Sequence, residues 1–280
     1  MDVALVLGAD GQLGREFVKA LDEKCRVVGA DLKQVDVCDA SDLAKLTTEL
    51  RPDTIINCAA WNAVDEAEER PLDALYTNAY AVRNLANLAG ELSATLVHFS
   101  TDFVFDGQGL KPYTETDQPR PISTYGMSKL LGEAACALWP RHYVLRLSSL
   151  YGGHKRRSFV DHIASAVRAG RAVQVYRDRF VSPSYAPDVV AATLALLRRQ
   201  APFGLYHCVS TDFCSWYDLA LEVTRQLLAS QSCLEPIGFS NTPGRARRPQ
   251  FCALSTGKLE ACIGPMTSWK DALARHLATQ

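Results

Sequence analysis

The sequence has no long apolar run and no excess of charge of one sign. No stretch approaches the roughly 20 apolar residues of a membrane-spanning helix, so we expect no membrane contact. With 30 basic and 31 acidic residues the net charge is −1, and no broad positive field would attract nucleic acid. The apolar start has no preceding basic segment and soon turns into glycines, so we interpret it as a strand and not a signal peptide.

Disulfide and metal-binding patterns are also lacking. The nine cysteines are odd in number and form no C-x-x-C pair, and most, like Cys58 and Cys208, lie in apolar surroundings. We therefore expect buried, reduced thiols in a cytoplasmic protein. No cluster has the spacing of metal ligands, so no metal is predicted.

The first half of the chain alternates short apolar runs with helical patterns. Strands are expected at 3–7, 26–30, 54–58, 95–100 and 143–147. Helices are expected at 12–22, 42–50, 71–92 and 125–138. This alternation predicts the α/β class, a Rossmann-type doubly wound parallel sheet whose ligands bind at the carboxyl edge of the strands.

The pattern changes after about residue 150. Helices are expected at 159–169, 187–199, 216–228 and 269–278, and strands at 172–176 and 205–209. We expect residues 151–280 to form mainly a smaller C-terminal lobe over a substrate. Elements from about 187 to 209 are expected to return to the main sheet formed by residues 1–150.

A glycine-rich turn, Gly8-Ala-Asp-Gly11-Gln-Leu-Gly14, joins the first strand to the first helix. Glycines let the backbone approach a pyrophosphate, and the helix N-terminus offers N–H groups and a positive dipole end. This turn indicates that residues 1–150 bind NAD(P). The spacing differs from the G-x-G-x-x-G of classical dehydrogenases, so a turn without a ligand is the alternative.

An acidic residue, Asp31, ends the second strand. It can accept hydrogen bonds from both ribose hydroxyls of NAD and would repel the 2′-phosphate of NADP. Lys33 could offset that repulsion, so NADH and NADPH both stay open, with NADH favoured. Asp36 and Val37 are candidates for the adenine side, with a solvated turn as the alternative.

Tyr125 and Lys129 are spaced i and i+4, which places both on one face of a helix. A free tyrosine has a pKa near 10, and a neighbouring ammonium is expected to lower the tyrosine pKa towards neutrality. The pair therefore predicts acid–base chemistry. Ser100, Thr101 and Asp102 end the preceding strand. A hydroxyl there is expected to hydrogen-bond a substrate carbonyl and tune the tyrosine, unless these residues only cap that strand.

Several motifs in a fixed order resemble the extended short-chain dehydrogenase/reductases, and among them the dTDP-4-dehydrorhamnose reductase family. They span nearly the whole chain and read GADGQLGRE, NCAAWNAVDEAEE, STDFVFDG, YGMSKLLGE, RLSSLYG, GLYH and RRP. The resemblance implies hydride transfer from NAD(P)H to C4 of a dTDP-4-keto-6-deoxyhexose, as in dTDP-rhamnose biosynthesis. It makes Tyr125 the proton donor, Lys129 its partner and Thr101 the tuning hydroxyl.

The binding residues expected from these motifs form two groups. The cofactor group, in addition to Tyr125 and Lys129, is Gly8, Gly11, Gln12, Leu13, Gly14, Asp31, Asp36, Val37, Ala59, Ala60, Trp61 and Asn62. The substrate group is Thr101, Asp102, Tyr125, Ser149 and Arg248. The family often has Trp at the position of Ser149 and Tyr at that of Phe103, so the exact sugar and its stereochemistry stay open.

Other functions remain as alternatives. A dehydratase would need Glu after Asp102, where this chain has Phe103. One is a nucleotide-sugar epimerase, which uses the same Tyr/Lys chemistry. Another is a non-catalytic NADP-binding regulatory subunit like that of methionine adenosyltransferase. A homodimer is suggested only by the superfamily. The basic stretches 154–157 and 245–248 are candidates for a pyrophosphate or are solvated loops, and Asn78 either braces the site or packs its helix.

Overall fold

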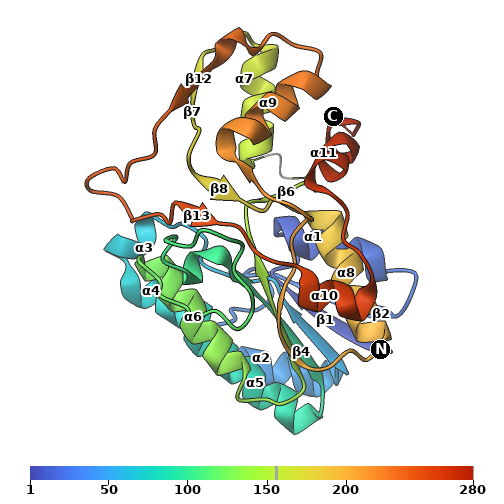
Figure 1. The fold of residues 1–280 in the computed structure, drawn as a ribbon. Coiled ribbons are helices and arrows are strands. Elements are labelled where there is room, and N and C mark those ends of the chain that lie inside the picture. Colours follow the sequence, from blue (N-terminus) through green and yellow to red (C-terminus); the bar gives the residue numbers. More distant parts are fainter. Residues whose placement is uncertain (155–156, 280) are drawn as a thin grey trace.

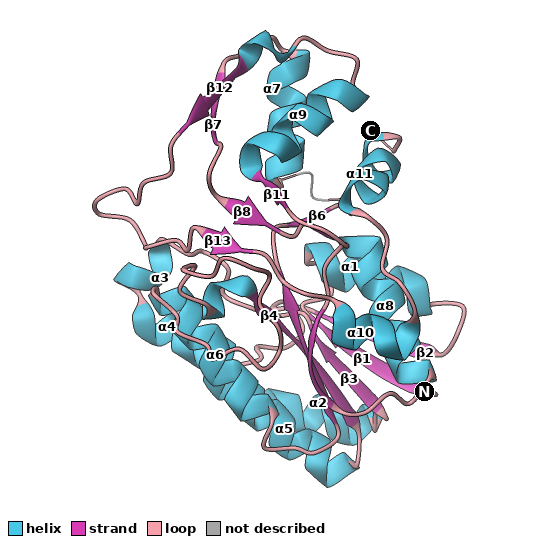
Figure 2. Ribbon diagram, in the orientation of Figure 1, coloured by secondary structure: helices cyan, strands magenta, loops and turns pink. Residues whose placement is uncertain are grey.

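Six parallel strands form the central sheet of the computed structural model, which describes residues 1–154 and 157–279. Their order is β10-β5-β4-β3-β1-β2 (Figures 1 and 2). The strands are β1 (Val3–Leu7), β2 (Arg26–Ala30), β3 (Thr54–Asn57), β4 (Thr95–Thr101), β5 (His142–Leu147) and β10 (Gly204–His207). The chain order reverses between β1 and β3, so the crevice at their carboxyl ends is where such a sheet binds ligands.

Helices cover both faces of this sheet, and each face has its own apolar core. One core packs under α1 (Gln12–Leu21), α8 (Ala186–Arg198) and α10 (Gly257–Ile263). The other packs under α2 (Ala40–Leu50), α5 (Ala81–Leu92) and α6 (Thr124–Cys136). The fold class predicted from the sequence is confirmed: an α/β doubly wound parallel sheet. In the described residues, no helix is long and apolar enough to cross a membrane.

A smaller lobe lies above the carboxyl edge of the sheet (Figure 1). Its helices are α7 (Phe159–Arg168), α9 (Trp216–Gln226) and α11 (Trp269–Leu277), which share an apolar core. Its strands are short: β6 (Leu150–Tyr151), β7 (Val173–Tyr176), β8 (Phe180–Val181), β9 (Ser184–Tyr185), β11 (Cys214–Ser215), β12 (Leu234–Ile237) and β13 (Phe251–Cys252). By contrast, α8 packs on α1 and β10 is an edge strand of the main sheet.

Residues 71–92, which were expected to form one helix, are helical throughout, but a π-helical stretch separates two α-helical parts. They comprise α4 (Pro71–Leu75), the π-helical stretch η1 (Tyr76–Tyr80) and α5. The chain also contains α3 (Glu66–Glu69) and the short turns η2 (Asp102–Val104) and η3 (Gln231–Cys233), which the sequence pattern did not indicate. A π-helical stretch inserts one residue into a helix and often marks a functional site.

Candidate active site

The glycine turn packs backbone against backbone. Gly8 has φ +70°, and a Cβ there would lie 2.7 Å from Ala59 N. A Cβ on Gly14 would lie 2.1 Å from Gly8 O. Gly11 is the N-cap residue of α1 and has no side chain that could cap the helix, and the first turn of α1 carries no acidic residue. The free N–H groups at this helix start therefore suit an anionic ligand.

A cavity of about 890 Å³ runs from this turn past the end of β2. Its walls include Gly8, Gly11, Gln12, Asp31, Asp36, Val37, Ala59, Ala60, Trp61 and Asn62. The structure thus brings together nearly all the residues expected around a cofactor. Leu13 lines a neighbouring cavity, and Gly14 is buried beneath the turn.

The charge of Asp31 lies at the far end of this first cavity. Its carboxylate accepts hydrogen bonds from Asp10 N at 2.8 Å and Leu32 N at 2.7 Å. Arg70, which was not predicted from the sequence, also lines this cavity, and its guanidinium stacks 4.9 Å from the centroid of the Trp61 ring. No motif marked Arg70, because its position depends on the fold of α3 and α4.

A second cavity, of about 450 Å³, lies deeper at the carboxyl end of β4. It contains Thr101, Asp102, Tyr125, Lys129 and Ser149, which the sequence predicted as catalytic or substrate-binding. The two cavities share a wall formed by Gly11, Gln12, Cys58, Ala60 and Asn62. The first cavity is therefore adjacent to the cavity that contains the tyrosine.

Burial dominates the acid–base properties of the central pair. It raises the pKa of Tyr125 to about 12, against a side-chain interaction with Thr101 that lowers it, and the Tyr125 hydroxyl donates to Asn62 Oδ1 at 3.4 Å. Burial lowers the pKa of Lys129 to about 8, against Glu133, which raises it. The expectation that Lys129 would lower the tyrosine pKa is wrong, because burial raises the Tyr125 pKa and Lys129 is not among the groups that shift it. The Lys129 Nζ instead donates to Phe99 O at 2.6 Å.

Thr101 and Asp102 form a buried hydrogen-bonded unit beside Tyr125. The Thr101 hydroxyl donates to Asp102 Oδ1 at 3.0 Å, and the Ser148 hydroxyl donates to Asp102 Oδ2 at 2.8 Å. Burial raises the pKa of Asp102. Phe103 packs edge-on against the Tyr125 ring, with centroids 5.6 Å apart. The hydroxyl at position 101 is therefore held in place, as a tuning role for it requires.

Asn78 braces the loop that separates the two cavities. Its Oδ1 accepts from Trp61 N at 2.9 Å, and its Nδ2 donates to Trp61 O at 3.0 Å. The same Nδ2 donates to Ser128 Oγ on α6 at 2.9 Å. Of the two roles left open for Asn78, the structure shows the brace.

Arg248 lies apart from both cavities. Its guanidinium pairs with Asp65, with Nη1 2.9 Å from Oδ1. Of the other basic stretch, Lys155 and Arg156 lie outside the described residues. Ser149 lines the second cavity with φ +45°, a left-handed conformation that is uncommon for a residue with a side chain.

Two buried histidines belong to the core, as do four of the cysteines, whereas the other five, Cys58 included, are only partly buried. Burial lowers the pKa of His98 well below its ordinary value and that of His207 to about 3. All nine cysteines are free thiols. Among the described residues no three His, Cys, Asp or Glu side chains are grouped as a metal would need.

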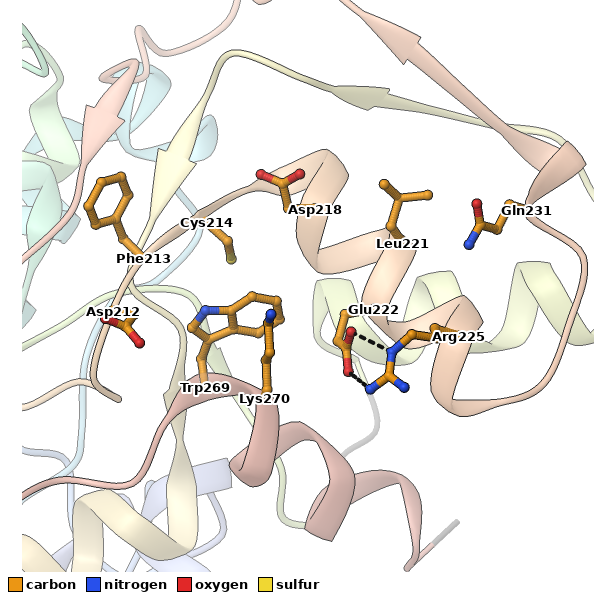
Figure 3. Close-up of a pocket in the computed structure, with 10 residues that line it drawn as sticks. All are labelled: Asp212, Phe213, Cys214, Asp218, Leu221, Glu222, Arg225, Gln231, Trp269 and Lys270. Atoms are coloured by element: carbon orange, nitrogen blue, oxygen red, sulfur yellow. Dashed lines mark hydrogen bonds and ion pairs between the residues drawn. The ribbon is translucent and has the colours of Figure 1, made fainter.

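A separate cleft lies in the small lobe between α9 and α11 (Figure 3). It has a volume of about 560 Å³ and carries both signs of charge, including the Glu222–Arg225 ion pair and Lys270. None of the residues predicted from the sequence lies there, so the active-site candidate is the pair of cavities on the sheet.

Comparison with known proteins gives a consistent result. The family model for the RmlD substrate binding domain matches residues 1–280. The chain belongs to this family. The resemblance inferred from the motifs is thereby confirmed.

Curated relatives match over almost the whole chain. A dTDP-4-keto-6-deoxy-D-glucose reductase of Streptomyces niveus is 34% identical over 277 residues, covering 97% of this chain and 95% of its own. A dTDP-4-dehydrorhamnose reductase of Escherichia coli K12 is 32% identical over 291 residues, covering 98% and 96%. The relatives thus carry the names of the reductase class predicted from the motifs.

Solved structures show the same fold. A dTDP-4-dehydrorhamnose reductase of Clostridium acetobutylicum has a TM-score of 0.92 and 33% identity, covering 100% of this chain and 99% of that one. One from Bacillus anthracis, in complex with NADP, has a TM-score of 0.93 and 30% identity, covering 100% and 98%.

Proposed function

We propose that the protein reduces the C4 keto group of a dTDP-4-keto-6-deoxyhexose with NADH or NADPH. The observation that carries this proposal is the position of Tyr125, Lys129 and Thr101 in a cavity that shares a wall with a glycine-turn cavity. Membership in a family whose relatives are named as reductases of such sugars supports it.

The residues of the first cavity fit a dinucleotide. Gly8 and Gly14 give the close backbone approach that a pyrophosphate needs, and Asp31 offers a carboxylate to a ribose. When bound, a reduced nicotinamide supplies the hydride. Asp31 favours NADH in this proposal, because its charge opposes a 2′-phosphate.

The proton is proposed to come from Tyr125. A buried phenol whose pKa is about 12 keeps its proton at neutral pH, so it is available to protonate the alkoxide formed at C4. The phenolate left behind is stabilised by the Lys129 ammonium and the Thr101 hydroxyl. We assign Asp102 and Ser149, which line the second cavity, to the sugar nucleotide, and the lobe of α7, α9 and α11 to covering it. Arg248 is also assigned to the substrate, although it lines neither cavity and would have to leave its ion pair with Asp65 to reach it.

The proposed partner is a second copy of this chain, as the superfamily resemblance suggests. Leu72, Tyr76, Tyr80 and Leu131 are exposed and line one apolar groove on α4, η1 and α6. Such patches on a protein surface commonly mark interfaces. Light scattering should show a dimer that Leu131→Glu converts to a monomer, and a monomeric wild type would remove this part of the proposal.

The deciding experiment is loss of NAD(P)H absorbance with freshly made dTDP-4-keto-6-deoxy sugars of both C5 configurations, with products identified by NMR. We expect oxidation of the cofactor with one of them. Interconversion of C4 epimers without net oxidation would favour an epimerase. Cofactor binding with no turnover of any sugar would favour a regulatory subunit.

A further inference from the structure

The helix face that carries Tyr125 and Lys129 continues to a third polar residue. Glu133 lies one further turn along α6, at the same i, i+4 spacing. All three side chains are buried and face the end of β4. Tyr125 meets Thr101, Lys129 donates to Phe99 O, and Glu133 accepts from Ser100 Oγ. Each of these three helix residues therefore contacts one of the last three residues of β4, Phe99, Ser100 and Thr101.

The Glu133 carboxylate is held by side chains from two strands, β4 and β5. Arg146 on β5 donates to it twice, from Nε to Oε1 at 2.8 Å and from Nη2 to Oε2 at 2.7 Å. Arg146 is paired with Ser100 in the register of β4 and β5. Both carboxylate oxygens are thus occupied, and the carboxylate cannot move away from Lys129 without breaking a bidentate pair.

The other titratable groups that face Lys129 carry no charge at neutral pH. Burial raises the pKa of the Cys58 and Cys136 thiols, and it raises that of Tyr125 to about 12. His98 on β4 also faces Lys129, and burial together with the lysine charge keeps its pKa well below the ordinary value. Among the described groups acting on Lys129, Glu133 is therefore the charged one.

We propose that Glu133 is a positioning residue whose carboxylate, fixed by Arg146 and Ser100, holds Lys129 as an ammonium one helical turn away. A buried ammonium is costly unless an anion compensates it. Without Glu133, Lys129 would lose its proton at a lower pH and could no longer stabilise a Tyr125 phenolate. The inference rests on the proposed reaction for its catalytic consequence, but the charge of Lys129 can be measured without a substrate.

The test compares the pH dependence of unfolding with and without Lys129. The Lys129 pKa is about 8 in the native protein, against roughly 10.4 in an unfolded chain. The unfolded chain then binds the extra proton between these values, so stability relative to Lys129→Met rises with pH from about 8. In the Glu133→Gln background we expect this rise to begin about one pH unit lower.

Ser100→Ala is the matched control. It removes one hydrogen bond to Glu133 but leaves every charge, so the onset should stay where the wild type has it. If Glu133→Gln does not fold, Glu133→Gln/Arg146→Met removes both members of the ion pair and leaves no guanidinium without its carboxylate. The onset should still move down. The same onset in all backgrounds would overturn the proposal.

Turnover supplies the second readout. Activity should fall on the alkaline side as Lys129 loses its proton, and Glu133→Gln should move that limb to lower pH. A slower enzyme with an unmoved limb would make Glu133 a structural residue and overturn the proposal. A shifted unfolding onset in a protein that turns over no keto sugar would support the charge relationship and refute the proposed reaction instead.

Discussion

Asn78 holds Trp61 by both of its backbone polar groups. Asn78 is fully buried within the π-helical stretch η1, and Trp61 lies on the loop shared by the two cavities. The π-helical stretch therefore places the Asn78 amide where it contacts both the loop of Trp61 and Ser128 of α6.

Replacing Asn78 should therefore loosen the cofactor site. Asn78→Ala leaves Trp61 N–H and C=O without partners, at a cost of about 1–3 kcal/mol each if they stay buried. We expect lower stability in urea and weaker NAD(P)H binding measured by fluorescence titration. Asn87→Ala, on the exposed side of α5, is the control. Cofactor affinity equal to that of the control would mean that the brace does not position the loop.

Tyr125→Phe should separate binding from chemistry. The substitution keeps the ring that packs on Phe103 but removes the proposed proton donor. Turnover should fall by about 10²–10⁴-fold while NAD(P)H affinity is retained. Steady-state rates and fluorescence titration measure the two quantities. Undiminished turnover would remove Tyr125 from the mechanism.

Asp31→Ala should change the choice between cofactors. Loss of the carboxylate removes an acceptor for the ribose hydroxyls and a repulsion towards a 2′-phosphate, so the variant should lose affinity for NADH more than for NADPH. Asp36→Ala, in the same cavity, is the matched control and should change both affinities alike. An unchanged NADH/NADPH ratio for Asp31→Ala would show that the cofactor ribose lies elsewhere.

The sequence was sufficient for the main sheet because its signals are local. β1 and β2 have the expected bounds, since each is an apolar run ended by a glycine or an acid. The site residues of the glycine turn and of α6 could be found in the same way, because their spacing fixes which face they share. The predicted ends of all the expected helices and strands lie within two residues of those in the structure, and half of them coincide.

What the sequence did not reveal depends on contacts between distant segments. β8, β11 and β13 have two residues each and exist only through pairing with one another. Arg70 reaches the first cavity by stacking on Trp61, and Glu133 matters through Arg146 on another element. The expected fall in the Tyr125 pKa was wrong because the degree of burial, which raises this pKa, depends on the tertiary fold and not on the local sequence.

The tightest glycine of the turn gives a prediction that needs no substrate. In Gly14→Ala the new Cβ would lie 2.1 Å from Gly8 O, a backbone atom, so β1 and α1 must move apart. We expect a loss of about 1–3 kcal/mol of stability and a loss of NAD(P)H binding, because the pyrophosphate turn opens.

Gly257→Ala is the matched control, since its Cβ meets only Ser255 Oγ at 3.7 Å, and alanine is the better helix former. Urea denaturation and cofactor titration of both variants decide the matter. If Gly14→Ala binds NAD(P)H as Gly257→Ala does, the close approach of Gly14 to Gly8 is not what shapes the cofactor site.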